Sequence, residues 1–310
     1  MKKDYCALSF SEKERICEEA FINNGPYWHV YTDGTKMQNI FCSKEDFEMG
    51  MWILAGSRCL CNKARLLTFE LMRNHVHLIM SGKKEACLEL FEVFAGKLKR
   101  TLTRMGRAID WKNFEANILP IESLQALRNE IIYTNRNAFV ADPAQTPDSY
   151  PWGGGCAYFN AWLKHLQPTP IKSMKIEKQR ALLHCRDTTA YACLLSLNDT
   201  AYIPSFCDIS LGESFFQNPR SYFNSLTRNA EAFSQIASRL KDTIFLTDEE
   251  LHAATVAYIN NEYNIKQTTL LSPQQKIDTA RHLHFKFNAT NQQIRRILRL
   301  ELKILEEMFP

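Results

Sequence analysis

The sequence predicts an α+β protein, with an antiparallel sheet, helices packed on one face of that sheet, and an all-α C-terminal extension. Segments of alternating apolar residues and segments of helical periodicity follow one another in the order β-α-β-β-α-β-α over residues 21–152, and this order fits such a sheet. Over residues 247–310 helix-capping signatures recur. A chain of 310 residues is longer than one compact core usually needs, so more than one domain is expected.

Helices and strands are predicted to alternate in the first half of the chain. Ser11 and Glu14 are spaced as a capping box, and Ser43 is a candidate N-cap. The predicted elements are a helix over residues 9–23, a strand over 27–32, a helix from Lys44 to about Cys61, two strands within Ala64–Gly82, a helix over Lys83–Arg107, a strand over Phe114–Leu119 that ends at Pro120, and a helix over 121–135.

The second half is predicted to be helical. Prolines 143, 147 and 151 mark an irregular segment, and residues 172–246 follow as a helical region. Helices are then expected over about 248–264, 273–286, 291–298 and 300–308. The predicted domains are an N-terminal helix (1–25), a catalytic domain (26–155), a helical linker or extension (156–246) and a helix-turn-helix-like segment (247–310).

Composition narrows the classes of function. The hydrophobic content of 45% and the charged content of 23% are ordinary for a globular protein. No apolar run reaches the roughly 18 residues of a membrane span, and no signal peptide follows Met1-Lys2-Lys3, so no membrane association is expected. The ten cysteines form neither a disulfide framework nor a zinc ribbon, which favours reduced thiols in the cytoplasm.

Basic residues are concentrated in two stretches, although the net charge is only +4. Such stretches suit a polyanion, and the alternative for each is a solvated helix face. In the second stretch, short capped helices followed by basic residues match a helix-turn-helix DNA reader, with Asn288 in place of the usual turn glycine. The alternative there is helical packing alone. The candidate DNA-binding residues are Lys97, Lys99, Arg100 and Arg104 in the first stretch and Arg295, Arg296 and Arg299 in the second.

The candidate chemistry begins at His75 and His77. They are separated by one residue in a predicted strand, so both imidazoles point to the same face. Two neutral imidazoles on one face can hold a divalent metal. Alone, the pattern is more often that of two packed or surface histidines without a ligand.

Tyr133 and Asn137 are four residues apart in a predicted helix and therefore share one face. If that face covers His75 and His77, the site combines two imidazoles, an amide oxygen and a phenol. A mixed nitrogen and oxygen set without thiolate favours Mg²⁺ or Mn²⁺, which would polarise a phosphate. Tyr133 would then attack a phosphodiester to give a phosphotyrosine and free a 3′ hydroxyl, with no need for ATP. Taken singly, Tyr133 would be interpreted as an aromatic residue that packs a helix, and only the combination of residues indicates chemistry.

Several segments occur together in a recognisable order. They are Tyr27-Trp28-His29-Val30, Ile40-Phe41 with Glu45-Asp46, Leu71-Met72-Arg73-Asn74-His75-Val76-His77-Leu78, Tyr133 with Asn137 and Ala141, and Tyr150-Pro151-Trp152. Over about residues 26–153 the chain resembles the single-tyrosine HUH transposases of insertion sequences, and especially their relatives associated with repetitive extragenic palindromes.

The resemblance implies an HUH fold with a ferredoxin-like (RRM-like) palm, a divalent metal on His75, His77 and Asn137, and Tyr133 as nucleophile. It implies single-stranded DNA with hairpins or palindromes as substrate, a nucleoid-associated location, and a homodimer or a monomer, since relatives of both kinds exist. Two residues depart from the family pattern, because Arg73 and Ala138 stand where the family has proline.

Three hypotheses follow from the sequence. The first is a metal-dependent DNA strand transferase of the transposase type. The second is a domesticated, sequence-specific DNA-binding protein with little or no catalytic activity. The third is an α+β protein whose histidines have only a structural role.

Overall fold

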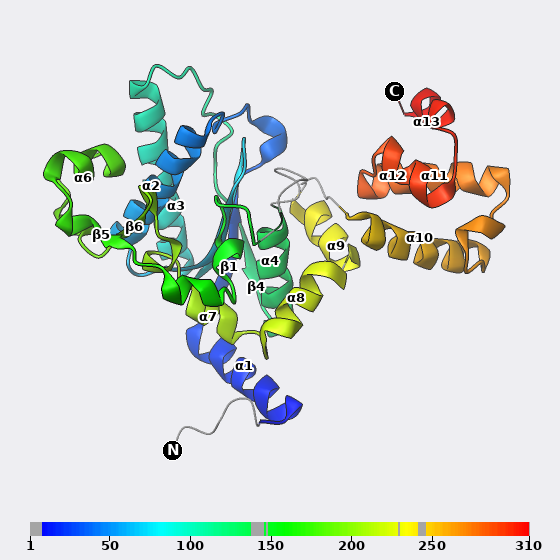
Figure 1. The fold of residues 1–310 in the computed structure, drawn as a ribbon, viewed down its shortest axis with the longest axis horizontal. Helices are drawn as coiled ribbons and strands as arrows, with labels where there is room; N and C mark the ends of the chain where they lie inside the picture. Colours follow the sequence, from blue (N-terminus) through cyan, green and yellow to red (C-terminus); the bar gives the residue numbers. More distant parts are fainter. Residues whose placement is uncertain (1–7, 138–145, 147, 229, 241–245, 310) are drawn as a thin grey trace. The chain divides into compact units, whose positions relative to one another are not determined.

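A computed structural model of the chain describes residues 8–137, 146, 148–228, 230–240 and 246–309 (Figure 1). The chain divides into two units, Met1–Tyr222 and Phe223–Pro310, which are described separately below. No helix in the described part of the chain is both long enough and apolar enough to cross a membrane.

A four-stranded antiparallel sheet forms the centre of the first unit. Its strand order is β2-β3-β1-β4, so the strand that carries His77 is an inner strand, as predicted. Pro120 does not end the last strand but lies within it, because β4 is an edge strand and an edge tolerates the missing N–H. The strands are β1 (Tyr27–Tyr31), β2 (Arg65–Leu71), β3 (Val76–Ser81) and β4 (Asn117–Ile121).

Helices cover both faces of this sheet. Neighbouring residues of β1 point to opposite faces of the sheet. Trp28 lies on the face toward α3, where Lys84 is over its ring, and His29 lies on the face toward α4, where it bonds to Glu130. Figure 1 shows α2 and α3 on one side of the strands and α4 on the other. The predicted α+β class and antiparallel sheet are confirmed. The bounds of the helices are α2 Lys44–Leu60, α3 Lys84–Arg104 and α4 Leu124–Arg136.

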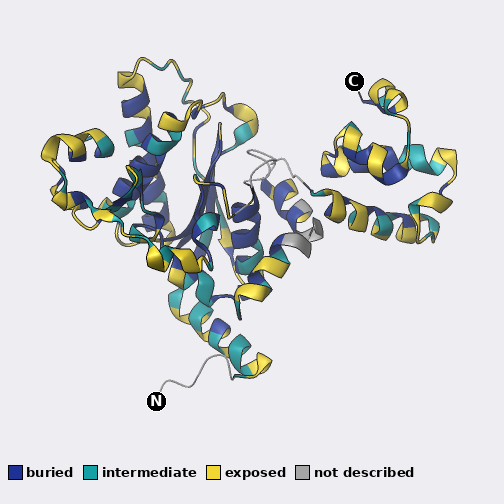
Figure 2. Ribbon diagram, viewed as in Figure 1, coloured by how far each residue is buried: buried dark blue, intermediate teal, exposed yellow. Residues whose placement is uncertain are grey.

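The two faces of the sheet differ in chemistry. The face toward α2 and α3 is apolar and includes Val30, Leu78 and Met80, all fully buried. The face toward α4 carries the buried polar residues His29 and His77. Both faces of β1, β2 and β3 are covered, since nearly all of their residues are buried (Figure 2), whereas Asn117 and Pro120 of the edge strand β4 are exposed. Buried polar side chains need partners, and here they gather on one face of the sheet. A functional site is therefore expected on the face toward α4.

Helix α1 (Phe10–Asn24) begins one residue after Ser9, so the capping box is Ser9 with Glu12 rather than Ser11 with Glu14. Glu14 is instead turned toward α4, where Arg128 donates two hydrogen bonds to it. The prediction failed because the motif Ser-x-x-Glu occurs twice in this overlapping stretch, and only the true start of the helix selects one of them.

Residues 156–222 contain strands as well as helices and belong to the first unit. The segment predicted as a helical linker therefore holds a small sheet, whose strands of two or three residues are too short for a periodic signal. Tyr158 donates a hydrogen bond to the carbonyl of Leu67 in β2. The elements of this region are α6 (Ile176–Leu183), α7 (Ile209–Ser214), β5 (Thr169–Pro170), β6 (Leu195–Leu197) and β7 (Thr200–Ala201).

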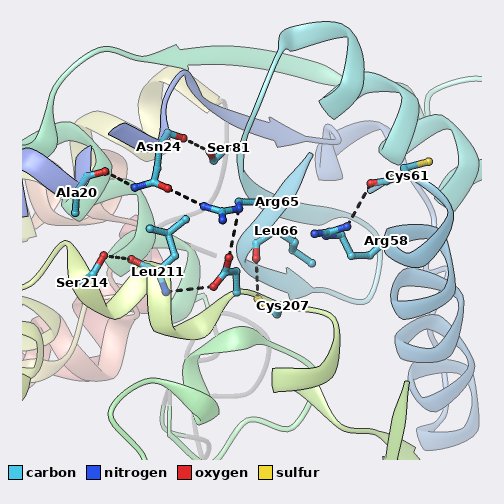
Figure 3. A network of polar contacts seen from close by, with 11 residues as sticks. Ala20, Asn24, Arg58, Cys61, Arg65, Leu66, Ser81, Cys207, Leu211 and Ser214 are labelled. Atoms are coloured by element: carbon cyan, nitrogen blue, oxygen red, sulfur yellow. Dashed lines mark hydrogen bonds and ion pairs between the residues drawn. The ribbon is translucent and has the colours of Figure 1, made fainter. Parts of the chain in front are cut away.

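Figure 3 shows the polar contacts that connect this region to β2, an edge strand of the main sheet. Arg65 at the start of β2 donates to the side chain of Asn24 at the end of α1 and pairs with Asp208, the N-cap of α7. Cys207 donates from its thiol to the carbonyl of Leu66 at 3.3 Å. One arginine thus joins α1, β2 and α7.

The second unit is helical. Capping boxes at Thr247, Ser272 and Thr290 confirm the predicted starts of three helices. Asn288 and Arg299 adopt left-handed conformations (φ 50° and 54°) and end two of them, so Asn288 fills the glycine position as expected. The helices are α8 (Pro219–Arg228), which crosses the division, α9 (Ala230–Leu240), α10 (Asp248–Tyr263), α11 (Pro273–Phe287), α12 (Asn291–Leu298) and α13 (Leu302–Met308).

Candidate active site

His75 and His77 lie next to each other beside the start of β3. Their ring centroids are 5.0 Å apart and the ring planes are nearly perpendicular. Strand β3 begins at Val76, so His77 lies on the strand, whereas His75 precedes it in the turn from β2. Both side chains are buried. The two imidazoles are close together, as predicted, but the prediction that His75 lies on the strand was wrong.

The turn before β3 fixes the ring of His75. Asn74 accepts a hydrogen bond at its Oδ1 from His75 Nδ1 (2.7 Å) and donates from its Nδ2 to the carbonyl of Gly34 (2.7 Å). An amide oxygen only accepts, so Nδ1 of His75 carries the proton and Nε2 is the nitrogen with a lone pair. This is the tautomer that a metal ligand needs.

Tyr133 lies on α4 directly over the histidines. Its ring centroid is 5.8 Å from that of His77 and 6.4 Å from that of His29, and the side chain is buried. Asn137 is the C-cap of α4, one turn further on, and its side chain is also buried. Its amide nitrogen has no hydrogen-bond partner within the part of the chain that the structure describes. The structure thus brings Tyr133 to His77, as predicted, with Asn137 one turn further along the same helix.

Two residues of this site were not predicted from the sequence. His29 on β1 lies between His77 and α4, with Nε2 3.0 Å from His77 Nδ1 and Nδ1 2.8 Å from Glu130 Oε2. All three side chains are at most 2% exposed. A signal was present, since Glu130 precedes Tyr133 by three residues and therefore shares its helix face.

The residues present fit a divalent metal. His75 and His77 both have Nδ1 occupied by a hydrogen bond, so each would ligate through Nε2, and the Asn137 amide would supply an oxygen. No group of three or more His, Cys, Asp or Glu residues that could hold a metal occurs among the described residues. The set proposed here contains only two residues of those types.

A second buried carboxyl lies close by but belongs to a different contact. Glu70 is opposite His77 on β2, and its carboxyl packs against Gly153, to which β2 is bridged. Burial raises the pKa of Glu70 well above its usual range.

The Tyr150-Pro151-Trp152 motif next to Gly153 contacts the same strand, β2, because the N–H of Leu71 donates to the carbonyl of Trp152 and the carbonyl of Leu71 accepts from the Tyr150 hydroxyl. Ala138 and Ala141 lie outside the described residues.

The basic residues of α3 are not part of this site, because α3 lies on the opposite face of the sheet from α4. Lys97, Arg100 and Arg104 line a cleft of about 700 Å³ together with Arg186. Lys99 is exposed on the same helix but does not line the cleft. A polyanion bound there would contact the molecule away from Tyr133.

In the second unit, Arg295, Arg296 and Arg299 line a cleft of about 940 Å³ on and after α12. Arg296 forms a two-pronged ion pair with Asp248, with distances of 2.7 and 3.0 Å. Arg295 and Arg299 are exposed. The predicted basic surface is therefore present, and one of its three arginines is engaged within the unit.

A methyl group at Gly34 is expected to disturb the predicted metal site selectively. A Cβ there would lie 2.6 Å from His75 Nδ1, closer than contacts allow, so the imidazole must shift. We expect Gly34→Ala to weaken Mn²⁺ binding about tenfold, the size of effect seen when a group that orients a ligand is lost. Isothermal titration with Mn²⁺ measures this directly.

The control for this variant is Gly96→Ala, since a Cβ on Gly96 in α3 meets only the tip of the flexible Arg100 side chain. That variant is expected to bind Mn²⁺ as the wild type does. Unchanged affinity in Gly34→Ala would show that His75 is not a ligand.

Comparisons of the chain with protein-family models, with curated proteins and with solved structures found no match. The features that indicate a function are therefore the buried histidines, the tyrosine above them and the basic clefts.

Proposed function

We propose that the protein is a metal-dependent DNA strand transferase that cuts single-stranded DNA next to hairpins or palindromes through a 5′-phosphotyrosine at Tyr133. The observation that carries the proposal is the contact of the Tyr133 ring with His77, whose own neighbour is His75 (centroid distances 5.8 and 5.0 Å). A phenol beside two imidazoles is a set of groups suited to phosphoryl transfer.

In the proposed reaction, the Tyr133 oxygen forms a bond to phosphorus and loses its proton, while the bond from phosphorus to the 3′ oxygen breaks. The departing 3′ oxygen takes up a proton and leaves as a hydroxyl. A later attack by a 3′ hydroxyl on the phosphotyrosine reverses the step and joins a strand, so no ATP is consumed. Mg²⁺ or Mn²⁺ bound by His75, His77 and Asn137 would stabilise the negative charge on the phosphate during both steps.

Tyr133 is buried, so a DNA strand must displace part of the chain that covers the hydroxyl before it can react. A buried nucleophile is compatible with strand transfer, because burial protects the phosphotyrosine from hydrolysis by water.

The basic residues Lys97, Arg100 and Arg104 would bind phosphates of the DNA on the other side of the sheet. These residues lie on the opposite face from Tyr133 and would take no part in the chemistry. A DNA substrate of this kind would imply a cytoplasmic, nucleoid-associated protein.

The direct test is incubation of the wild-type protein with end-labelled single-stranded DNA that carries a hairpin. Mg²⁺, Mn²⁺ or a chelator is added, and the products are separated on a denaturing gel. A protein band that carries label, and that forms only with metal, is the expected result. The absence of such a band on substrates with varied hairpin and flanking sequences would contradict the proposal.

A second candidate, a DNA-binding regulator without catalysis, is favoured by the arginines of the second unit. A plot of log affinity against log salt has a negative slope. This candidate predicts that Arg295→Gln and Arg299→Gln each make the slope less negative by about 0.9, the value for one phosphate contact. Arg296→Gln is expected to change the slope less, because Asp248 already pairs with this arginine.

Fluorescence anisotropy of duplex and hairpin DNA over a range of salt concentrations measures the slopes. Equal slopes for the wild type and all three variants would exclude this surface from DNA binding. The remaining alternative, a structural protein, predicts no change in thermal stability when Mg²⁺ or Mn²⁺ is added.

A further inference from the structure

A continuous chain of buried hydrogen bonds leads from α4 through β1 to β3. Glu130 Oε2 lies 2.8 Å from His29 Nδ1, and His29 Nε2 lies 3.0 Å from His77 Nδ1. We infer that Glu130 and His29 are positioning residues that set the tautomer and the charge of His77 for metal binding. This inference rests on the proposed metal site, although it does not depend on any reaction with DNA.

The carboxylate of Glu130 determines which nitrogen donates and which accepts in each of these hydrogen bonds. An ionised carboxylate only accepts hydrogen bonds, so His29 must donate from Nδ1. A neutral His29 then has a lone pair on Nε2, and this nitrogen can only accept, so His77 donates from its own Nδ1. His77 is thereby left with the lone pair on Nε2. The carboxylate thus determines, through one intervening imidazole, which nitrogen of His77 can bind a metal.

The charge of the site points to the same role. Two neutral imidazoles and one amide would leave the charge of a divalent cation without a balancing anion. An ionised Glu130, which is 2% exposed, would supply that negative charge through His29. Polarisation along the two hydrogen bonds would also make His77 a stronger ligand.

His75 is oriented differently. Its Nδ1 bonds to the neutral side-chain amide of Asn74, with no carboxylate in that contact. The two proposed imidazole ligands are therefore unequal, and removal of the charge at Glu130 should act through His77.

The inference is tested by Mn²⁺ binding to the DNA-free protein, followed by isothermal titration and by the loss of the free Mn²⁺ spectrum in electron paramagnetic resonance. Glu130→Gln has the same shape, and its amide oxygen can still accept from His29. We expect affinity for Mn²⁺ to fall 10- to 100-fold, about the range for loss of a group that orients a metal ligand. Glu130→Asp keeps the charge and is expected to recover part of that loss.

Glu70→Gln is the matched control. It also replaces a buried glutamate on the same face of the sheet, but Glu70 packs against Gly153 and forms no part of the chain from Glu130 to His77. Its affinity for Mn²⁺ is expected to equal that of the wild type. Equal losses in Glu70→Gln and Glu130→Gln, or no loss in either, would overturn the inference.

The tautomer is read without any substitution, and so without risk to folding. Long-range ¹H–¹⁵N correlation spectra of the metal-free, ¹⁵N-histidine-labelled protein distinguish the two neutral tautomers. His77 and His29 are both expected to carry their proton on Nδ1. A proton on Nε2 of His77 would overturn the inference whatever the outcome with DNA.

The test of Mn²⁺ binding and the test of the DNA adduct can give different outcomes, so the inference and the proposed reaction can fail independently. Tight Mn²⁺ binding that depends on Glu130, without any DNA adduct, would support the inference and reject the strand transferase. A DNA adduct with Mn²⁺ affinity unchanged in Glu130→Gln would do the reverse.

Discussion

Replacement of Tyr133 by phenylalanine is expected to abolish the covalent DNA adduct while DNA binding and Mn²⁺ binding stay as in the wild type. The substitution removes only the hydroxyl that would form the bond to phosphorus, and the ring that packs at 5.8 Å from His77 remains. Loss of a buried hydroxyl changes stability by only about 1 kcal/mol, so the variant should remain folded. The adduct is scored on a denaturing gel, and binding is scored by anisotropy on the same DNA.

Tyr31→Phe provides the matched control. Tyr31 is also buried, and its ring stacks on His77 from the neighbouring strand at 6.2 Å with an interplanar angle of 13°. Removal of this hydroxyl should leave the adduct in place. An adduct that persists in Tyr133→Phe, or one that is lost in Tyr31→Phe alone, would assign the nucleophile to a different residue.

Much of the fold could be predicted because its signals are local. The two strands around Arg73-Asn74 and the helix that contains Tyr133 each lie within one short periodic stretch. The capping boxes at Thr247, Ser272 and Thr290 likewise need only four consecutive residues. The proximity of His75 to His77 could be predicted because they are two positions apart in the sequence, although His75 lies in the turn before β3 and not on the strand.

The rest of the site could not be predicted because it depends on contacts between distant parts of the chain. His29 and Glu130 are 101 positions apart, and only the register of β1 beside β3, with α4 above them, brings both to His77. The separation of Lys97 from Tyr133 has the same origin, since sequence does not tell which face of the sheet a helix covers. Strands as short as β6 and β7 give no periodic signal, so residues 156–222 were expected to be helical.

Replacement of Arg128 by alanine is expected to destabilise the protein more than any surface change on the same helices. Arg128 of α4 donates two hydrogen bonds to Glu14 of α1 (2.7 and 2.9 Å) and one to the carbonyl of Phe215 (2.6 Å). Its loss leaves a partly buried carboxylate and a carbonyl without this donor, which costs about 2–4 kcal/mol in the free energy of unfolding. Urea denaturation at neutral pH measures the difference.

The cost should also depend on pH. The hydrogen bonds from Arg128 lower the pKa of Glu14 below its ordinary value of 4.5. A depressed folded-state pKa gives stability that is complete above the unfolded pKa and is lost as pH falls through the folded value. The difference between wild type and Arg128→Ala should therefore shrink when denaturation is repeated below pH 4.5.

The control for Arg128→Ala is Arg15→Ala, which removes an arginine of α1 whose pair with Glu19 is 3.9 Å long and largely exposed. An exposed pair of this kind contributes at most about 0.5 kcal/mol, so this variant should be nearly as stable as the wild type. If both variants lost the same stability, or if the loss in Arg128→Ala were the same at both pH values, Arg128 would not be what holds α4 to α1. Because α4 carries Tyr133 and Glu130, a large loss of stability in Arg128→Ala would show that contacts outside the site contribute to the stability of the fold that places this helix over the histidines.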